Sequence, residues 1–432
     1  MKKILVKGPY LTQSGYGHHA RTVIRALETR PDLFDIYLQP ISWGHTSWIW
    51  EDNEERARYD EYLQKTINHI QSKQQFDMSL QVTIPNEWEP VAPINVGVTA
   101  GIEVDRVAKE WIEKSVGVNK ILTISEHSKN TYENTVWKIT APSGAGGHGE
   151  EDHHIKTPTE IVSISYPALT YDIEKLDLNL TTDFNFLCVA QLGPRKNVNS
   201  LISCFVETFK DNENVGLIIK ANSAKNSKLD RFHTERKFKE VLQPYKDRKC
   251  KIYLLHGYLN DNQMAGLYNH SKIKALVSTT HGEGFGLPIF EAACYGLPVI
   301  ATNWSGHLDF LNMPQKQKNG KIKQKSMFSK ISYSLEEVPP EAVWNGVIVE
   351  GSKWANPEQG SIKMNLEEVY KDHGRFKKRA KQLQKWVNEE FDKEKQYKEY
   401  VDSILSAFDS YSPVEMSDAW LNNMEDIVTQ YD

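Results

Sequence analysis

Short apolar runs alternate with segments of helical spacing along most of this 432-residue chain. Near the N-terminus, KILVKG at 3–8 is followed by an amphipathic segment from Ala20 to Leu27 and then by FDIYLQPIS at 34–42. Strand, helix and strand in this order form a βαβ unit, whose crossover makes neighbouring strands parallel. The alternation therefore predicts an α/β fold with mostly parallel sheets.

The alternation is interrupted near the middle of the chain. Residues 172–183, DIEKLDLNLTTD, have weak periodicity and many turn formers, and a new strand-like run, FNFLCVA, begins at Phe184. The βαβ pattern then restarts, and a chain of this length is expected to form two domains. We predict one Rossmann-like domain over 1–178, a second over 179–390, and a C-terminal helical segment over 391–432.

Two stretches lack a periodic pattern. Residues 141–158, APSGAGGHGEEDHHIKTP, are rich in glycine, acidic residues and histidine, and we expect a mobile surface loop there. Residues 313–341 are expected to form a long loop or an insertion. This second stretch crowds together six lysines: Lys316, Lys318, Lys321, Lys323, Lys325 and Lys330.

Composition indicates a cytoplasmic protein. No apolar run approaches the roughly 18 residues that a membrane span needs. The net charge of −5 argues against a generally nucleic-acid-binding surface. The four cysteines form no C-x-x-C pair and lie in or beside apolar segments, which predicts reduced core residues: Cys188, Cys204, Cys250 and Cys294.

The stretch HGEGFGLPIFEAACYGLPVIAT, 281–302, predicts a ligand site. Its HGEGFG part is a turn between a buried strand and a helix, which places it at the carboxyl edge of a parallel sheet, where ligands bind. Uncovered glycine amides and the helix N-terminus suit a phosphate. Glu283 and Glu291 then suit hydroxyl groups, and Glu291 is placed to accept both hydroxyls of a ribose. Two glutamates at this spacing also arise by chance, as solvated surface residues.

Two other turns have a similar position. GPRKN at 193–197 places Arg195 and Lys196 before a helix that we expect Asn197 to cap. Two cations there oppose the helix dipole unless an anion lies between them, and a diphosphate would resolve the conflict; solvated cations are the alternative. After the first strand, Gly15 and Gly17 precede a helix, but without the G-x-G-x-x-G spacing this signal alone favours a simple turn.

Together these segments resemble the retaining glycosyltransferases of the GT-B fold, family 4 (glycosyl transferases group 1). The resemblance is strong over about 185–310, through the E-x7-E element, the G-F-G-L-P core and GPRKNVNSLI, and it is fainter over the N-terminal half. It implies two Rossmann-like domains facing across a cleft, with the C-terminal helix crossing back to the N-terminal domain. The implied activity is transfer of a hexose or pentose from a UDP- or GDP-linked sugar.

The resemblance also implies roles for individual residues. Glu291 would bind the donor ribose, Glu283 the hydroxyls of the transferred sugar, and Arg195 with Lys196 the departing diphosphate. The donor would further be lined by Gly15 and Gly17 of the opposite domain, by Tyr258 and Leu259 near the base, and by Gly284, Phe285, Gly286 and Leu287. The chain has no D-x-D motif, so no metal and no other cofactor is expected.

The family's usual catalytic histidine is missing from the corresponding stretch, VGVTAGIEVDR. Glu103 or Asp105 stands where it is expected, and His18 or His19 in the glycine loop is also placed to face the site. We predict that Glu103, Glu283, Arg195 and Lys196 act in catalysis. His148, His153 and His154 are a conceivable metal-ligand set, but their acidic context favours a solvated loop.

The sequence does not identify the acceptor. The segment ARTVIRALETR is only mildly basic, which favours a saccharide, metabolite, protein or modified nucleic-acid base over a membrane-bound acceptor, although peripheral membrane contact stays open. The lysines of 316–330 would suit a phosphate-bearing acceptor such as nucleic acid. The main alternative to an enzyme is a non-catalytic protein that binds sugar nucleotides or glycans, and the sequence does not set an oligomeric state.

Overall fold

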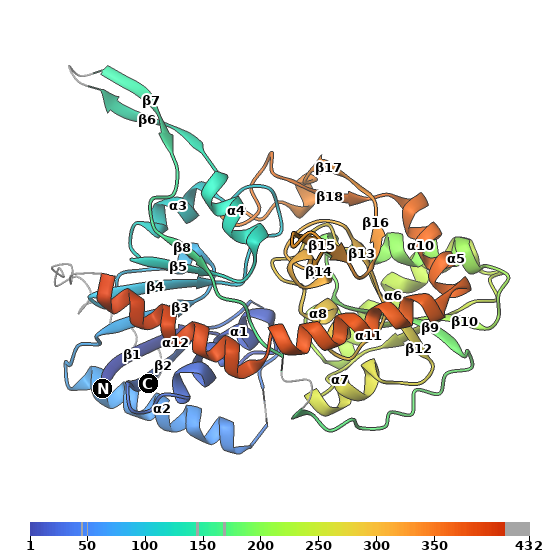
Figure 1. Ribbon diagram of the computed structural model, residues 1–432, viewed down its shortest axis with the longest axis horizontal. Helices are drawn as coiled ribbons and strands as arrows, with labels where there is room; N and C mark the ends of the chain where they lie inside the picture. Colours follow the sequence, from blue (N-terminus) through green and yellow to red (C-terminus); the bar gives the residue numbers. More distant parts are fainter. Residues whose placement is uncertain (45, 50, 144–146, 167–169, 411–432) are drawn as a thin grey trace.

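The computed structural model describes the chain except residues 45, 50, 144–146, 167–169 and 411–432; residues 140–143, 147–149 and 410 are described by their backbone alone. The described part forms two six-stranded parallel sheets with helices on their faces (Figure 1). The predicted α/β class with two doubly wound halves is therefore confirmed. The sheets fall on either side of residue 178, and the domain boundaries themselves remain predictions.

The first sheet has the strand order β2-β1-β3-β4-β5-β8. Apolar strands alternate with helices in this half of the chain, because the crossover helices bury both faces of a parallel sheet. Its strands are β1 (Lys2–Gly8), β2 (Phe34–Pro40), β3 (Met78–Val82), β4 (Ile94–Thr99), β5 (Lys120–Thr123) and β8 (Thr159–Ile161). Its helices are α1 (Gly15–Glu28), α2 (Glu54–Gln71), α3 (Lys109–Ser115) and α4 (Glu126–Asn134), with a 3₁₀ turn at Pro85–Glu87.

The second sheet has the order β11-β10-β9-β12-β13-β16. Its strands are β9 (Phe184–Gln191), β10 (Val215–Asn222), β11 (Lys251–Leu255), β12 (Ile273–Ser278), β13 (Val299–Thr302) and β16 (Ser329–Ile331). Its helices are α5 (Val198–Phe209), α6 (Lys228–Leu242), α7 (Asp261–Tyr268), α8 (Leu287–Cys294), α9 (Leu308–Leu311), α10 (Gln359–Lys371) and α11 (His373–Glu390), with 3₁₀ turns at Pro194–Lys196, Gln243–Tyr245 and Pro340–Ala342.

The last helix, α12 (Lys393–Ser410), returns to the N-terminal half (Figure 1). It packs against α1, and Tyr400, Val401 and Ile404 are buried in the same apolar core as β1 and β3. The hydroxyl of Tyr400 also donates to the carbonyl of Val162, 3.1 Å away. The crossing back of the C-terminal helix is thus confirmed, while residues 411–432 of the predicted segment lie outside the described residues.

Both aperiodic stretches contain strands, which overturns the loop predicted over 141–158 and the loop alternative for 313–341, but not the alternative of an insertion. Residues 141–158 belong largely to a hairpin of β6 (Trp137–Ser143) and β7 (Gly147–His153), which projects from the N-terminal half (Figure 1). Residues 313–341 hold β16 and a second hairpin, β14 (Asn312–Lys316) with β15 (Ile322–Ser326), while β17 (Tyr333–Glu337) pairs with β18 (Lys353–Pro357). The β14–β15 hairpin is mostly exposed, so its sequence carries no alternation of apolar and polar residues.

The predicted core cysteines are buried, with free thiols at Cys188, Cys204, Cys250 and Cys294. Within the described ranges, no helix combines the length and apolarity needed to cross a bilayer.

Candidate active site

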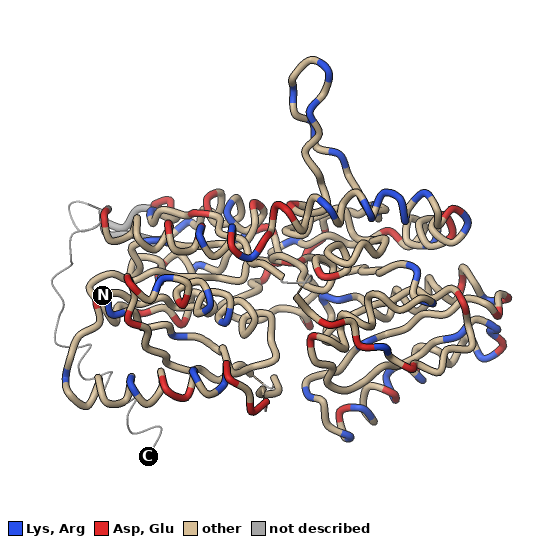
Figure 2. Tube along the Cα trace, turned by 60° about the horizontal axis from the view of Figure 1, so that its bottom comes forward, with Lys and Arg blue, Asp and Glu red and all other residues tan. Residues whose placement is uncertain are grey.

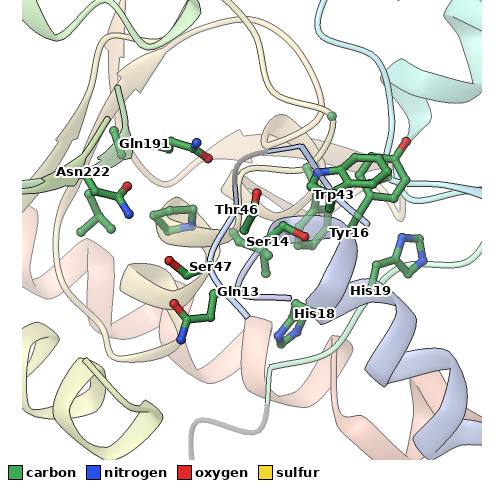
Figure 3. A pocket seen from close by; sticks show the side chains of 18 of the residues that line it. Gln13, Ser14, Tyr16, His18, His19, Trp43, Thr46, Ser47, Gln191 and Asn222 are labelled. Atoms are coloured by element: carbon green, nitrogen blue, oxygen red, sulfur yellow. The ribbon is translucent and has the colours of Figure 1, made fainter. Parts of the chain in front are cut away.

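A cleft of about 930 Å³ lies between the two sheets and is lined by both halves of the chain. Figure 3 shows Gln191 and Asn222, at the ends of β9 and β10, facing Thr46 and Ser47 of the N-terminal half. The cleft lies at the carboxyl ends of the strands, and both sheets reverse their strand order there, between β1 and β3 and between β9 and β12. This is the edge at which open α/β sheets bind ligands.

The glycines of the HGEGFG turn allow a close approach between the two halves. A Cβ atom on Gly282 would lie 2.2 Å from the carbonyl oxygen of Glu103, and one on Gly284 would lie 2.3 Å from that of Ala100. Gly286 has φ +92° and is the N-cap residue of α8, in agreement with the predicted turn between a strand and a helix. Gly282 and Gly284 are therefore required because the two halves of the chain pack closely at these positions. This reason differs from the predicted one, which is exposure of their amides to a phosphate.

Glu283 is bound by both predicted diphosphate cations. Its carboxylate accepts from Arg195 Nη1 at 3.0 Å and from Lys196 Nζ at 2.5 Å. Arg195 also donates to the carbonyl of Gly282 at 2.6 Å, while the backbone N–H of His281 donates to the carbonyl of Arg195 at 2.8 Å. The two turns are therefore one unit, and the anion that balances the cations in the structure is Glu283 itself.

Burial opposes ionisation of Glu283, but Lys196 and Arg195 outweigh it and hold the pKa of this carboxyl at about 2. Burial and the neighbouring Arg195 lower the pKa of Lys196, although Glu283 opposes this. Because the pKa of Glu283 is depressed from 4.5, its ion pairs stabilise the fold above pH 4.5, and this contribution is lost as the pH falls towards 2.

Asn197 was predicted to cap the following helix with its side chain, and this prediction is wrong. It has φ +51° and makes no side-chain capping bond to α5. Asparagine tolerates this left-handed conformation, which here joins the 3₁₀ turn at 194–196 to the helix. Its carbonyl accepts from Thr279 at 3.0 Å, so it ties this turn to the end of β12.

Glu103 lines the cleft beside this cluster, and its carboxylate lies 3.3 Å from Arg195 Nη2. Asp105 does not line the cleft, because its carboxylate accepts from the backbone N–H of Lys353 at 2.7 Å. His19 is buried and lies 2.6 Å from the hydroxyl of Tyr400, and His18 lies 3.3 Å from the carbonyl of Ser165. Burial lowers the pKa of both histidines to about 3, so both are neutral at pH 7.

Glu291 faces the same cleft one turn into α8. Its carboxylate accepts from the hydroxyl of Tyr268 at 2.6 Å. Burial raises the pKa of Glu291 to about 8, with a smaller contribution from Asp261 that the Tyr268 bond does not offset. A carboxyl group with this pKa is mostly protonated at pH 7 and accepts two hydroxyl donors only after it loses its proton.

We therefore expect donor affinity to depend on pH through Glu291. Between pH 6 and 8, donor binding should tighten by up to about tenfold per pH unit, since binding the ionised form releases one proton, and it should level off above pH 8. With no donor added, ionisation of Glu291 opposes folding, so its contribution to stability is lost as the pH rises from 4.5 through 8. Calorimetric titration across this range checks the slope, and Glu291→Gln should flatten it.

The predicted base-side residues, Tyr258 and Leu259, line the cleft with Met264. The hydroxyl of Tyr258 donates to Glu51 of the opposite half at 2.5 Å. Lys220, at the end of β10, donates to the carbonyl of Gly257 at 2.6 Å, and burial lowers its pKa to about 8. Sequence reasoning missed Glu51 and Lys220, because no local motif marks either residue.

Of the two glycines predicted to close over the donor, Gly15 lines the cleft at the start of α1, whereas Gly17 is not among the lining residues. Ser14 caps α1 by accepting from the N–H of Gly17 at 2.9 Å. A Cβ on Gly17 would lie 2.2 Å from the carbonyl of Thr12, so packing requires glycine there, whereas a Cβ on Gly15 would meet only Leu287 at 4.0 Å. The starts of α1 and α8 therefore lie close together, and two helix N-termini are directed at one region of the cleft.

The lysine-rich hairpin does not line the cleft. Figure 2 shows it rising from the face along which α11 runs, with several blue residues and no red ones. All six lysines of the segment are exposed: Lys316, Lys318, Lys321, Lys323, Lys325 and Lys330.

Within the part of the chain that the structure describes, no group of three or more His, Cys, Asp and Glu side chains is arranged to hold a metal ion. The side chain of His148, from the conceivable histidine set, lies outside that part, and the expectation of a metal-independent site stays a prediction.

The fold is that of the GT-B proteins. Sucrose-phosphate synthase from Thermosynechococcus elongatus superposes with a TM-score of 0.61 over 95% of this chain and 100% of its own, at 13% identity. HepE from Anabaena, solved with UDP and glucose, gives a TM-score of 0.56 over 94% of this chain and 100% of its own, at 14% identity. At these identities the likeness defines the fold, and the predicted GT-B class is confirmed.

Residues 172–326 match the model of the family described as "Glycosyl transferases group 1", which covers a little over a third of the chain. A serotype-specific mannosyltransferase, WbdA from Escherichia coli, is 31% identical over 116 residues, 27% of this chain and 13% of the relative. A probable sucrose-phosphate synthase from Thermosipho melanesiensis is 28% identical over 156 residues, 35% and 32% of the two chains. The chain thus carries a glycosyl transferases group 1 domain, and the matched segments span about an eighth to a third of these relatives.

Proposed function

We propose that the protein is a glycosyltransferase that moves a sugar from a nucleotide-diphosphate sugar to an acceptor hydroxyl, with retention of anomeric configuration and without a metal ion. The observation that carries this proposal is the cluster of Arg195, Lys196, Glu283 and Glu103 in a cleft between two Rossmann-like halves. The group 1 domain over 172–326 supports it.

The donor would lie along the C-terminal wall of the cleft. Glu291 would accept the ribose hydroxyls, Tyr258 and Leu259 would border the base, and the diphosphate would meet the cations beside the starts of α1 and α8. The transferred sugar would face Glu283 and the turn that follows it. The remaining donor contacts would come from Gly15, Gly284, Phe285, Gly286 and Leu287, while Gly17 would support the turn through its packing against Thr12. The donor's base would be uracil or guanine, and the sugar a hexose or pentose.

The charges of the cluster suit a departing diphosphate. Two cations and two carboxylates, Glu103 and Glu283, give the cluster no net charge, and two helix N-termini add partial positive charge. When the anomeric C–O bond breaks, its electron pair leaves with the phosphate, and cations already in place stabilise that charge most. The acceptor oxygen would bond the anomeric carbon from the same face, and its proton would pass to the departing phosphate oxygen.

A thermal-shift panel of UDP, GDP, ADP and their sugars tests the donor. At least one nucleotide sugar should raise Tm, because a ligand that binds only the folded state stabilises it in proportion to saturation. Slow release of the nucleotide diphosphate from the same donor should accompany the shift. A shift without any turnover supports the non-catalytic binding protein instead, and no shift with any member at millimolar concentration contradicts both.

A transferase acting on a modified nucleic-acid base is the second candidate, which the six exposed lysines of 316–330 favour. We then expect salt-sensitive retention on a DNA column, because phosphate contacts release counterions. Replacing the six lysines by glutamine should abolish the retention, while replacing six exposed lysines of α11 and α12 should preserve it. Retention that is absent, or unchanged by the first set, excludes this candidate.

We also propose a cytoplasmic location for the protein.

A further inference from the structure

The part of the cleft beyond Glu103 has an apolar wall. The residues of this wall line the cleft and also belong to, or pack against, the apolar core cluster that contains Trp88 and Trp111. They are Ile84, Trp111, Val343, Val347, Ile348 and Trp354. Trp344 lines the same region and keeps 57% of its surface exposed. An exposed tryptophan at the edge of an apolar wall offers a ring face to a ligand.

The wall is held in place by contacts between the two halves. Trp111 Nε1 donates to the carbonyl of Gly346 at 2.7 Å. Asp105 and Lys353 bond each other twice, once through their backbones at 2.9 Å and once through the Asp105 carboxylate. Trp344 and Ile348 exchange backbone bonds of 2.9 and 2.8 Å, which close a turn around Gly346. Trp344 is therefore exposed on a fixed turn.

A second aromatic surface lies at the same end of the cleft. The rings of Tyr16 and Trp43 are 4.4 Å apart, with an interplanar angle of 38° (Figure 3). The hydroxyl of Tyr16 lies 2.9 Å from that of Thr99, at the end of the strand that leads to Glu103. Aromatic rings and the carboxylate of Glu103 thus line the part of the cleft beside the Arg195–Lys196 cluster.

Each side-chain cation among the described lining residues already has a partner, and Arg195, which contacts Glu103, is also bound to Glu283. Arg21 donates to the carbonyls of Tyr10 and Thr12, and Lys220 donates to Gly257 on the base side. Arg25 is bound by Glu55 through two bonds, and Arg56 is bound by Asp60. Arg195 and Lys196 belong to the diphosphate cluster. A phosphorylated acceptor would bring a charge here without a partner, which is unfavourable in a partly desolvated site.

We propose that this end of the cleft is the acceptor site and that it binds a neutral saccharide, stacked on Trp344 and on the Tyr16–Trp43 pair with a hydroxyl donating to Glu103. Sugars present apolar C–H faces to aromatic rings and hydroxyls to carboxylates, which matches this combination. The inference rests on the proposed function, but it names a substrate class that the donor site does not define: an uncharged sugar and not a sugar phosphate.

The test compares matched acceptors with the donor that gives the largest thermal shift. Release of nucleotide diphosphate is followed with glucose, fructose, maltose and sucrose, and with glucose 6-phosphate and fructose 6-phosphate. At least one neutral sugar should raise release about tenfold above donor hydrolysis, and neither phosphate should. Faster release with a phosphate than with its parent sugar, or no response to any neutral sugar, overturns the inference.

Variants at Trp344 locate the acceptor. Trp344→Ala should raise the acceptor KM by about tenfold and lower the ratio of transfer to hydrolysis, and Trp344→Phe should recover most of the loss. Trp48 is also exposed, at 38%, but does not line the cleft, so Trp48→Ala serves as the control and should match the wild type. An unchanged acceptor KM in Trp344→Ala contradicts the assignment. If the wild type did not hydrolyse any donor, that result would instead contradict the proposed function.

Discussion

Replacing both Arg195 and Lys196 by alanine should lower kcat for sugar transfer by about a thousandfold or more, since removing even one preorganised charge-stabilising group typically costs 10²–10³. Donor hydrolysis should fall by a similar factor, because both reactions expel the same diphosphate. The measurement is nucleotide release with and without acceptor under saturating donor. Hydrolysis that is untouched in the double variant would show that these cations do not meet the leaving group.

The same substitution has a structural effect that must be separated from the catalytic one. Glu283 is 7% exposed and holds a charge only because the two cations surround it. Removing both leaves a buried carboxylate without a partner, which typically costs about 3–5 kcal/mol of unfolding free energy. Adding Glu283→Gln removes that charge, so we expect the triple variant to recover most of the stability, measured by urea unfolding, and none of the catalysis.

This arrangement also changes how the donor is expected to bind. The sequence placed Arg195 and Lys196 at a helix start and required an anion near them, and the structure supplies one from within the chain, through bonds of 2.5 and 3.0 Å to Glu283. A donor diphosphate would therefore share cations that are already neutralised. The transferred sugar would gain a carboxylate that Arg195 and Lys196 hold ionised even in mildly acidic solution.

The regular part of the fold follows from local pattern. Buried parallel strands read as short apolar runs, and α8 is marked by Pro288 near its start and by Gly296, with φ +70°, just after its end. The positions of the two turns followed as well, because β9 and β12 are neighbours and their carboxyl ends lie at one edge. The sequence was therefore sufficient to predict that Arg195 and Glu283 lie close together.

The sequence could not predict features that depend on contacts between residues far apart in the chain. His19 follows a glycine-rich stretch that suggests a site, but it lies in α1 and its partner is Tyr400, 381 residues away. The wall around Trp344 is held by residues of the other half, since Trp111 binds Gly346 and Asp105 binds Lys353. The β6–β7 hairpin projects from the N-terminal half, and a two-stranded ribbon with little buried surface leaves little apolar alternation to detect.

Replacing Glu291 by alanine should raise the donor KM by about ten- to a hundredfold, since a hydrogen bond to a charged group contributes about 1.5–3 kcal/mol. The fold should remain intact: burial raises the pKa of Glu291, so its charged form is unfavourable where it lies, and Tyr268 loses only one bond. Tyr268→Phe is the matched control, because it removes the same bond and keeps the carboxylate. We expect Tyr268→Phe to leave the donor KM within about threefold of the wild-type value. The corresponding change in binding free energy is smaller than the roughly 1.4 kcal/mol of a tenfold change. Unchanged donor kinetics in Glu291→Ala would contradict the ribose assignment, and a large loss in Tyr268→Phe alone would place the contact on the tyrosine.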